Sequence, residues 1–187
     1  MNEDIKKAIE VLREGGIILY PTDTIWGIGC DATNEEAVEK LYAIKHRDKS
    51  KSMLILLDNP GKLQAYIQDV PDIAWDLFDL ADKPLTIIFE NAKNLAPNLI
   101  NSDGTIGIRI TNEDFSRNLC MRFRKPIVST SANIAGQDAP QNFNDIDPEI
   151  IDMVDYVVEY RQDEMYKQTP SSIIKLGSSG EIDIIRK

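Results

Sequence analysis

This sequence contains few of the side chains that bind transition metals or form disulfides. Its 187 residues include two cysteines and one histidine, His46. Cys30 and Cys120 are far apart in the chain and form no C-x-x-C pair, so soft ligands are too few for a zinc site. No Ser-His-Asp or Cys-His set stands out, and nothing favours covalent catalysis. We expect reduced thiols and chemistry that depends on positioning and electrostatics.

Long hydrophobic runs are also missing. No apolar run approaches the ~20 residues that cross a bilayer, and the N-terminal "MNEDIKKAIEVL" is typical of an amphipathic helix rather than of a signal peptide. With 42% hydrophobic and 28% charged residues, the chain can form one sizeable core. No repeat, low-complexity segment or linker marks a boundary. We therefore expect one cytoplasmic globular domain over residues 1–187, with no membrane partner.

An excess of positive charge is absent, because the net charge is −10. A polyanion is repelled by such a protein at long range, which disfavours broad binding to nucleic acid. No G-x-x-x-x-G-K-[ST] loop occurs for a nucleotide phosphate. "GIGCDA" (27–32) matches the loose dinucleotide fingerprint G-x-G-x-x-A, but the helix after it begins only at the capping-box pattern Thr33-x-x-Glu36. This spacing disfavours a nicotinamide cofactor, whereas a small polyanion in one basic pocket stays compatible.

Helical and extended patterns alternate irregularly along the chain. Apolar spacing predicts helices at 3–14, 33–44, about 61–68, 71–81 and 112–123, the last opened by Thr111-x-x-Asp114. Apolar runs predict strands at 17–20, 24–32, 53–57, 84–90, 105–110 and 126–131, and in "YVVEY", "SSIIKL" and "EIDIIRK". The last two would pair through Gly177-Ser-Ser-Gly180. This order predicts an α/β fold with an open, mixed sheet.

One stretch concentrates positive charge against the overall balance. "LYAIKHRDKSKSMLILL" (41–57) places Lys45, Arg47, Lys49 and Lys51 at alternate positions. Alternate residues point the same way in an extended chain, so these cations could form an anion-binding edge. The alternative is a solvated group of cations at a helix C-terminus, where the helix dipole favours them.

Polar groups elsewhere support the anion-binding interpretation. "STSAN" (129–133) places Ser129 and Ser131 on one side of a strand end, with Asn133 just beyond, although such residues are also ordinary turn chemistry. Arg109 lies inside an expected strand, where a guanidinium needs an anionic partner in a ligand or in the protein. "YPTDT" (20–24) adds further hydrogen-bonding groups.

These segments resemble one family. "YPTDTIWGIGCDA", "LYAIKHRDKSKSMLILL", "KPLTIIF", "GTIGIRI", "KPIVSTSANIAG" and "TPSSIIK" occur in an order similar to that of the YrdC/TsaC family of threonylcarbamoyl-AMP synthases. The most specific parts are the K-x-R at Lys45 and Arg47 and the S-x-N at Ser131 and Asn133. Asp48 stands where the family usually has proline, and Leu56 stands where longer members often have histidine.

The resemblance implies a YrdC-like fold around a basic concave pocket, and a reaction. L-threonine, bicarbonate and ATP would condense to threonylcarbamoyl-AMP and pyrophosphate, the first step of tRNA threonylcarbamoyladenosine modification. Mg²⁺ is expected on the phosphates, without a protein ligand that the sequence can name. The adenylate would pass to a downstream tRNA threonylcarbamoyl-transferase complex, and a weak contact with RNA stays open.

The resemblance also implies a set of site residues. Lys45 and Arg47 would be catalytic, with Lys45 bridging toward the bicarbonate. The nucleotide would contact Arg47, Lys51, Thr105, Ser131, Asn133, Ala139 and Arg186. L-threonine would contact Thr24, Arg109, Ser129 and Ser171.

Two other functions stay open at this point. One is a double-stranded-RNA-binding module without synthase activity, which the net charge disfavours. The other is a carbamoyl-adenylate enzyme of hydrogenase maturation, which the lack of acylphosphatase-like and zinc-finger segments disfavours.

Overall fold

The structure is a computed structural model that describes residues 1–48, 53–167 and 169–187. Its strands are β1 (Ile18–Tyr20), β2 (Gly27–Gly29), β3 (Leu54–Leu57), β4 (Leu85–Phe89), β5 (Ile106–Ile110), β6 (Ile127–Ser131), β7 (Tyr156–Val157), β8 (Ser172–Leu176) and β9 (Ile182–Arg186). Its α-helices are α1 (Asn2–Arg13), α2 (Glu35–Ile44), α3 (Leu63–Tyr66), α4 (Ile73–Asp79), α5 (Asp114–Phe123) and α6 (Pro148–Met153). Two 3₁₀ turns, η1 (Pro60–Lys62) and η2 (Phe143–Asp145), complete the described elements.

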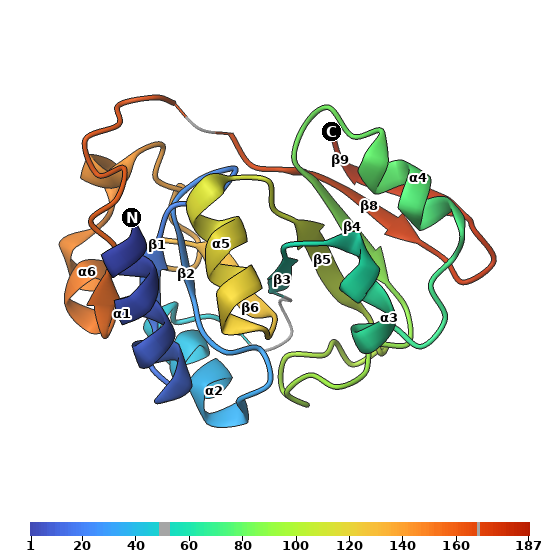
Figure 1. The fold of residues 1–187 in the computed structure, drawn as a ribbon, viewed down its shortest axis with the longest axis horizontal. Helices are drawn as coiled ribbons and strands as arrows, with labels where there is room; N and C mark the ends of the chain where they lie inside the picture. The colour runs from blue at the N-terminus through green and yellow to red at the C-terminus, as the bar shows by residue number, and fades with distance from the viewer. Residues whose placement is uncertain (49–52, 168) are drawn as a thin grey trace.

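The described strands form one sheet in the order β7-β1-β2-β6-β3-β5-β4-β8-β9. The pairs β1/β7, β3/β5 and β4/β8 are parallel, and the other pairs are antiparallel. The expectation of a mixed α/β sheet is thus confirmed, including the antiparallel pairing of the last two strands. Figure 1 shows the sheet running across the molecule, with β1 toward one end and β8 and β9 at the other. In the strand order β7 follows at the outer side of β1.

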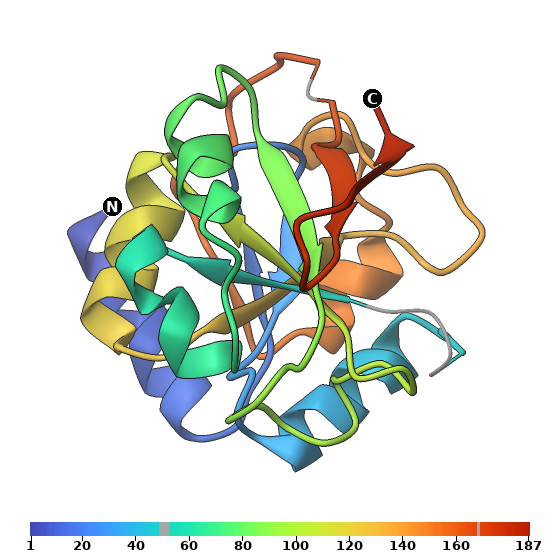
Figure 2. The same cartoon turned by 90° about the vertical axis from the view of Figure 1, so that its right-hand side faces the viewer.

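Helices cover the two faces of the sheet and divide the core. The apolar sides of α1 and α5 pack with Ile18, Tyr20 and Leu56 in one cluster. The larger cluster on the other side includes buried residues of α2, α3, α4 and α6. Leu56 stands at the position where longer members of the similar family often have histidine, and its side chain is fully buried in the first cluster. The view in Figure 2 looks from the end of the molecule that carries β8 and β9.

The fingerprint-like "GIGCDA" segment is a strand rather than a phosphate loop. Gly27–Gly29 forms β2 between two antiparallel neighbours, and α2 begins only at Glu35. A Cβ at Gly29 would lie 2.0 Å from the Val128 carbonyl oxygen, so glycine allows the backbones to approach closely. The glycines therefore serve the packing of the sheet.

Both helix starts taken from capping patterns are corrected by the structure. Asn34, not Thr33, caps α2, because its side chain accepts from the Ala37 N–H, whereas the Thr33 hydroxyl donates to Asp31. Glu113, not Thr111, caps α5 by accepting from the backbone of Phe115 and Ser116. In each case a competing acceptor lies one or two residues closer to the helix. No described helix is long and apolar enough to cross a membrane.

Candidate functional site

A cavity of about 260 Å³ lies against the sheet and is lined by residues from several of its strands. Strands β2, β3, β5, β6, β8 and β9, together with the loops between them, contribute to its walls. The described lining residues are Thr24, Ile25, Gly27, Arg47, Met53, Leu54, Arg109, Ser129, Thr130, Ser131, Ala139, Pro170, Ser171, Ile173 and Arg186.

The strand register brings these distant residues together. Leu54 of β3 pairs with Ser129 of β6 on one side and with Gly107 of β5 on the other. Arg109 follows Gly107 by two residues, so its side chain leaves the same face of the sheet. Ser131 pairs with Gly27 of β2. The sheet order therefore places segments from all parts of the chain around one space.

The lining is strongly basic for a protein of net charge −10. It includes the three arginines Arg47, Arg109 and Arg186, and none of its described members is an aspartate or glutamate. Burial lowers the pKa of Arg186, and the charge of Arg109 lowers it further. Burial also lowers the pKa of Arg47. Cations held close together in a partly buried wall favour an anionic ligand between them.

Ser171 and Arg186 are held in place by their neighbours. The Ser171 and Thr86 hydroxyl oxygens lie 2.8 Å apart, and the Arg186 Nε donates to the Ser171 carbonyl oxygen at 2.9 Å. Thr86 is on β4, directly beside Arg109 in the register. The C-terminal strand β9 thus supplies a guanidinium to a site whose other groups come from earlier in the chain.

Lys45 does not lie with its side chain along an extended basic edge. It is the C-cap of α2 with right-handed helical angles, and His46 after it has φ +49. Its side chain is 1% exposed, and Nζ donates to the carbonyl oxygens of Ser131 (2.5 Å) and Asn133 (2.7 Å). At Lys45 and His46 the chain therefore follows the end of a helix rather than one face of a strand, while Lys49 and Lys51 lie outside the described residues.

Lys45 holds the loop that contains Ser131 and Asn133 through both its side chain and its backbone. Burial and then the charge of Arg47 lower the pKa of Lys45 to about 7. Its own carbonyl oxygen accepts from the Ala135 N–H. Side chain and backbone of one residue therefore hold the loop that contains the S-x-N segment.

Asn133 and Thr105 are not among the described residues that line the cavity. The Asn133 side chain donates to the carbonyl oxygens of Ile134 and Gln137, while its Oδ1 is buried without a partner in the described structure. The Thr105 hydroxyl donates to Asp103 Oδ1 at 2.6 Å and accepts from the Asn101 amide, within a turn that precedes β5. Both side chains thus brace loops in this structure. Lys51, like Lys49, lies outside the described residues.

Asp23 is a residue that sequence reasoning did not single out. Its Oδ1 lies 3.0 Å from Arg109 Nε, and the two side chains are 10% and 5% exposed. The structure therefore supplies the protein partner that was one of two alternatives for Arg109. Arg109 is at the same time one of the residues that line the cavity. The sequence pointed only to the "PTDT" segment as a source of hydrogen-bonding groups. Its composition is typical of a turn and does not indicate that Asp23 pairs with Arg109.

The described residues offer no protein ligand set for Mg²⁺. No group of three or more histidine, cysteine, aspartate or glutamate side chains is arranged to hold a metal in the described part of the chain. The described cavity lining has no carboxylate, which is the ligand that Mg²⁺ prefers from proteins. We therefore assign the ion no residue and no step.

Comparisons with known proteins agree on the fold. Residues 10–187 match the family model Sua5/YciO/YrdC, described as "Telomere recombination". A threonylcarbamoyl-AMP synthase of Pseudoalteromonas translucida is 35% identical over 181 residues, covering 95% of each chain. The crystal structure of E. coli YciO has a TM-score of 0.86 at 23% identity, over 100% of this chain and 90% of that one. P. abyssi Sua5 in complex with L-threonine has a TM-score of 0.82 at 22% identity, over 92% and 50%.

Proposed function

The chain belongs to the Sua5/YciO/YrdC family, and on this basis we propose that it is an L-threonylcarbamoyladenylate synthase. It condenses L-threonine, bicarbonate and ATP to threonylcarbamoyl-AMP and pyrophosphate. The observation that carries the proposal is the cavity with three arginines and serine hydroxyls and no carboxylate among its described lining residues. Such a wall suits a triphosphate and a carboxylated amino acid, which together bring several negative charges.

The nucleotide occupies the part of the cavity near the ends of β6 and β9. Arg47, Ser131 and Arg186 supply charged and hydroxyl donors there, and Ala139 contributes through its backbone. Asn133 and Thr105 act from behind, as braces of the loops that carry these groups. Lys51 remains a prediction from the family pattern.

L-threonine occupies the part of the cavity between the "PTDT" loop and β5. Arg109 binds its carboxylate, and the hydroxyl groups of Thr24, Ser129 and Ser171 complete the contacts. A guanidinium suits this task because its planar donors match the two oxygens of a carboxylate. The P. abyssi relative, whose structure was determined with L-threonine, has the same fold.

The reaction needs no nucleophile from the protein. The threonine amine captures bicarbonate as an N-carboxylate with loss of water, and a carboxylate oxygen then attacks the α-phosphorus of ATP while pyrophosphate leaves. Arg47 and Arg186 neutralise charge that develops on the phosphates. Lys45 acts through the Ser131–Asn133 loop that its ammonium holds, rather than through a direct contact with bicarbonate.

The same site geometry bears on the two other functions. The basic residues of the cavity lining surround a space of about 260 Å³ and do not by themselves form a long basic surface for an RNA duplex. A carbamoyl-adenylate enzyme would use a similar nucleotide site but would not need a group for an amino-acid carboxylate. Arg109 therefore favours the threonine reaction. The threonylcarbamoyl-AMP formed in this reaction would be passed to the downstream tRNA-modifying transferase.

The proposed function predicts a strict requirement for both small substrates. Purified protein with ATP and Mg²⁺ should release pyrophosphate only when L-threonine and bicarbonate are both present, because the N-carboxylate must form before the phosphorus is attacked. The measurement is a coupled pyrophosphate assay with each component omitted in turn.

Two substitutions of substrate serve as controls. D-threonine should support little release, since the carboxylate and hydroxyl groups would exchange places in the site. Carbamoyl phosphate in place of threonine and bicarbonate tests the carbamoyl-adenylate alternative. Equal release without threonine would refute the synthase assignment.

A further inference from the structure

The ion pair between Asp23 and Arg109 takes no part in the bond-making and bond-breaking steps of the proposed reaction. Arg109 Nε and Asp23 Oδ1 are 3.0 Å apart, and both side chains are at least nine-tenths buried. Desolvation by burial raises the pKa of Asp23, whereas the charge of Arg109 acts in the opposite direction and favours the carboxylate. The contact is thus a buried pair of opposite charges, whose desolvation cost is offset only by good geometry and further hydrogen bonds.

The loop that carries Asp23 is braced on both sides of this residue. The Thr22 hydroxyl donates to the Ile25 carbonyl oxygen at 2.8 Å and accepts from the Thr24 N–H at 3.1 Å. Arg161 Nη1 donates to the Thr22 carbonyl oxygen at 3.3 Å and pairs with Glu113 at 3.1 Å. Asp23 is therefore presented from a fixed turn rather than from a loose loop.

The position of the contact on the guanidinium decides what remains for a ligand. Asp23 approaches Nε, at the side of the group, while Arg109 also lines the cavity. The terminal nitrogens Nη1 and Nη2 are then the donors that can meet a carboxylate in a two-point contact. A guanidinium held from the side keeps this edge in one orientation.

We propose that Asp23 is a positioning residue for Arg109, which it holds so that the terminal nitrogens face the carboxylate of the amino-acid substrate. This inference rests on the proposed function, in which Arg109 binds that carboxylate. Asp23 has a second, opposite effect, because its negative charge lowers the attraction of Arg109 for an anion. The two effects predict opposite changes in substrate affinity when the Asp23 carboxylate is removed: loss of positioning weakens binding, whereas loss of the negative charge strengthens it.

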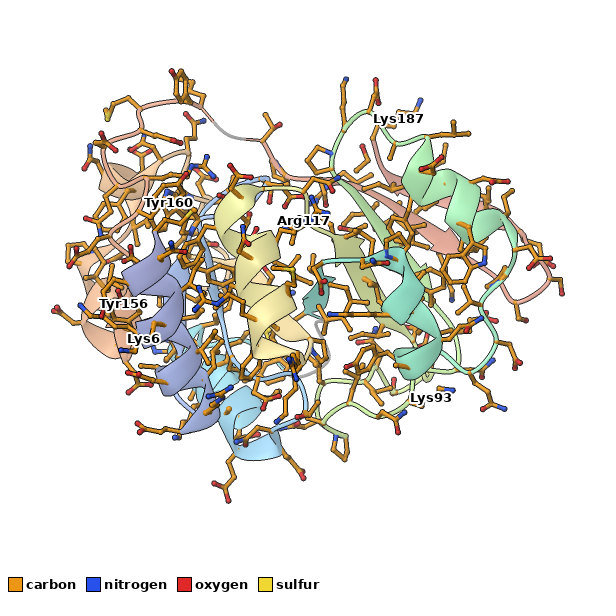
Figure 3. All side chains as sticks on the ribbon, in the orientation of Figure 1. Lys6, Lys93, Arg117, Tyr156, Tyr160 and Lys187 are labelled. Carbon is orange, nitrogen blue, oxygen red and sulfur yellow. The ribbon has the colours of Figure 1, made fainter. Side chains whose placement is uncertain are left out.

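A second cavity, of about 430 Å³, provides a matched control. Asp23 and Asp58 both line it, together with Arg117, which Figure 3 labels on α5. The Asp58 side chain is 11% exposed and pairs with Lys62 at 2.6 Å. It therefore resembles Asp23 in burial and in being paired with a cation, but it forms no ion pair with Arg109 in the described part of the chain and is not among the described residues that line the substrate cavity.

The test compares Asp23→Asn, Asp23→Glu and Asp58→Asn with the wild-type protein. L-threonine binding is measured by calorimetry in the presence of a non-hydrolysable ATP analogue, and the binding of that analogue is measured separately. Both Asp23 variants should weaken L-threonine binding by about tenfold or more, because either change displaces the guanidinium. Binding of the ATP analogue should change by less than about twofold. Asp58→Asn should bind both compounds as the wild type does.

Other results would overturn the positioning role. Tighter threonine binding by Asp23→Asn, with normal binding by Asp23→Glu, would mean that Asp23 only neutralises charge. If Asp23→Asn fails to fold, Asp23→Glu alone decides, since it keeps the charge and moves the carboxylate by one methylene. Wild-type protein that binds no L-threonine would refute the proposed function itself, whereas binding that is equal in all variants would refute only the role of Asp23.

Discussion

At the scale of single residues, Lys45 shows how burial changes the task of a charged group. The sequence offered Lys45 either as part of an anion-binding edge or as a solvated cation at a helix end. The structure buries it almost fully, with its ammonium bonded to two carbonyl oxygens of another loop. Carbonyl groups satisfy the donors but supply no full negative charge. Burial therefore dominates, and the pKa of Lys45 falls to about 7.

This lowered pKa predicts a dependence of stability on pH. An unfolded lysine keeps its proton up to about pH 10.4, so between about pH 7 and that value the unfolded chain binds more protons than the folded one. The contribution of Lys45 to stability must then rise with pH over this window. Relative to Lys45→Met, the wild type should gain up to about 1.4 kcal/mol of unfolding free energy per pH unit.

Urea unfolding of both proteins at several pH values above 7 measures this difference. Lys40→Met is the control, because Lys40 is an exposed lysine on the same helix that also donates to a carbonyl oxygen, that of Gly15. The difference between Lys40→Met and the wild type, measured at the same pH values, is the baseline with which the Lys45→Met difference is compared. A constant difference for Lys45→Met would show that its ammonium keeps an ordinary pKa.

At the scale of elements, α2 connects the core to the site. The helix buries Ala37, Val38 and Leu41 in the larger core cluster, and its C-terminus delivers Lys45 and Arg47 to the cavity region. Its N-terminus depends on Asn34, whose side chain accepts from the Ala37 N–H at 3.0 Å. The Asn34 cap thus stabilises α2, the helix that positions Lys45 and Arg47.

The cap can be tested apart from catalysis. Asn34→Ala should lower the free energy of unfolding by about 1 kcal/mol, because one N–H of the first turn loses its acceptor. Asn34→Asp keeps an acceptor and adds negative charge at a helix N-terminus, so its stability should be close to that of the wild type. The measurement is chemical denaturation, with the KM for ATP expected to be unchanged in both. Equal stability of all three proteins would contradict the assigned cap.

At the scale of the whole molecule, the net charge and the site charge have opposite signs. The chain carries a net charge of −10, while three arginines meet in the described lining of one cavity. A small anion can enter that local field, whereas a long polyanion also meets the acidic remainder of the surface. This distribution suits a nucleotide better than a nucleic acid.

The charge distribution predicts weak RNA binding. In filter-binding assays, retention of double-stranded RNA should be weak at every salt concentration, and it should fall less steeply with salt than for a protein that contacts many phosphates. Arg47→Ala should leave this weak retention unchanged while it weakens ATP binding. Tight retention at physiological salt would instead favour the RNA-binding module.

The sequence by itself determined the strands, most helices and the mixed α/β class, because apolar spacing and turn residues act locally. It also led to most of the groups that line the cavity, through the ordered motifs of a family. It failed where several local acceptors compete, as with Thr33 against Asn34, and α6 had no periodicity long enough to be recognised.

Only the tertiary structure decided which polar groups meet. The ion pair of Asp23 with Arg109 joins a turn before β2 to the middle of β5, and the bonds from Lys45 to the Ser131 and Asn133 carbonyl oxygens join a helix end to a loop after β6. Burial of these groups, and therefore their charge state, depends on how the sheet brings distant segments together. Such contacts leave no periodic trace in the sequence, since their cost and their benefit arise only after the chain has packed.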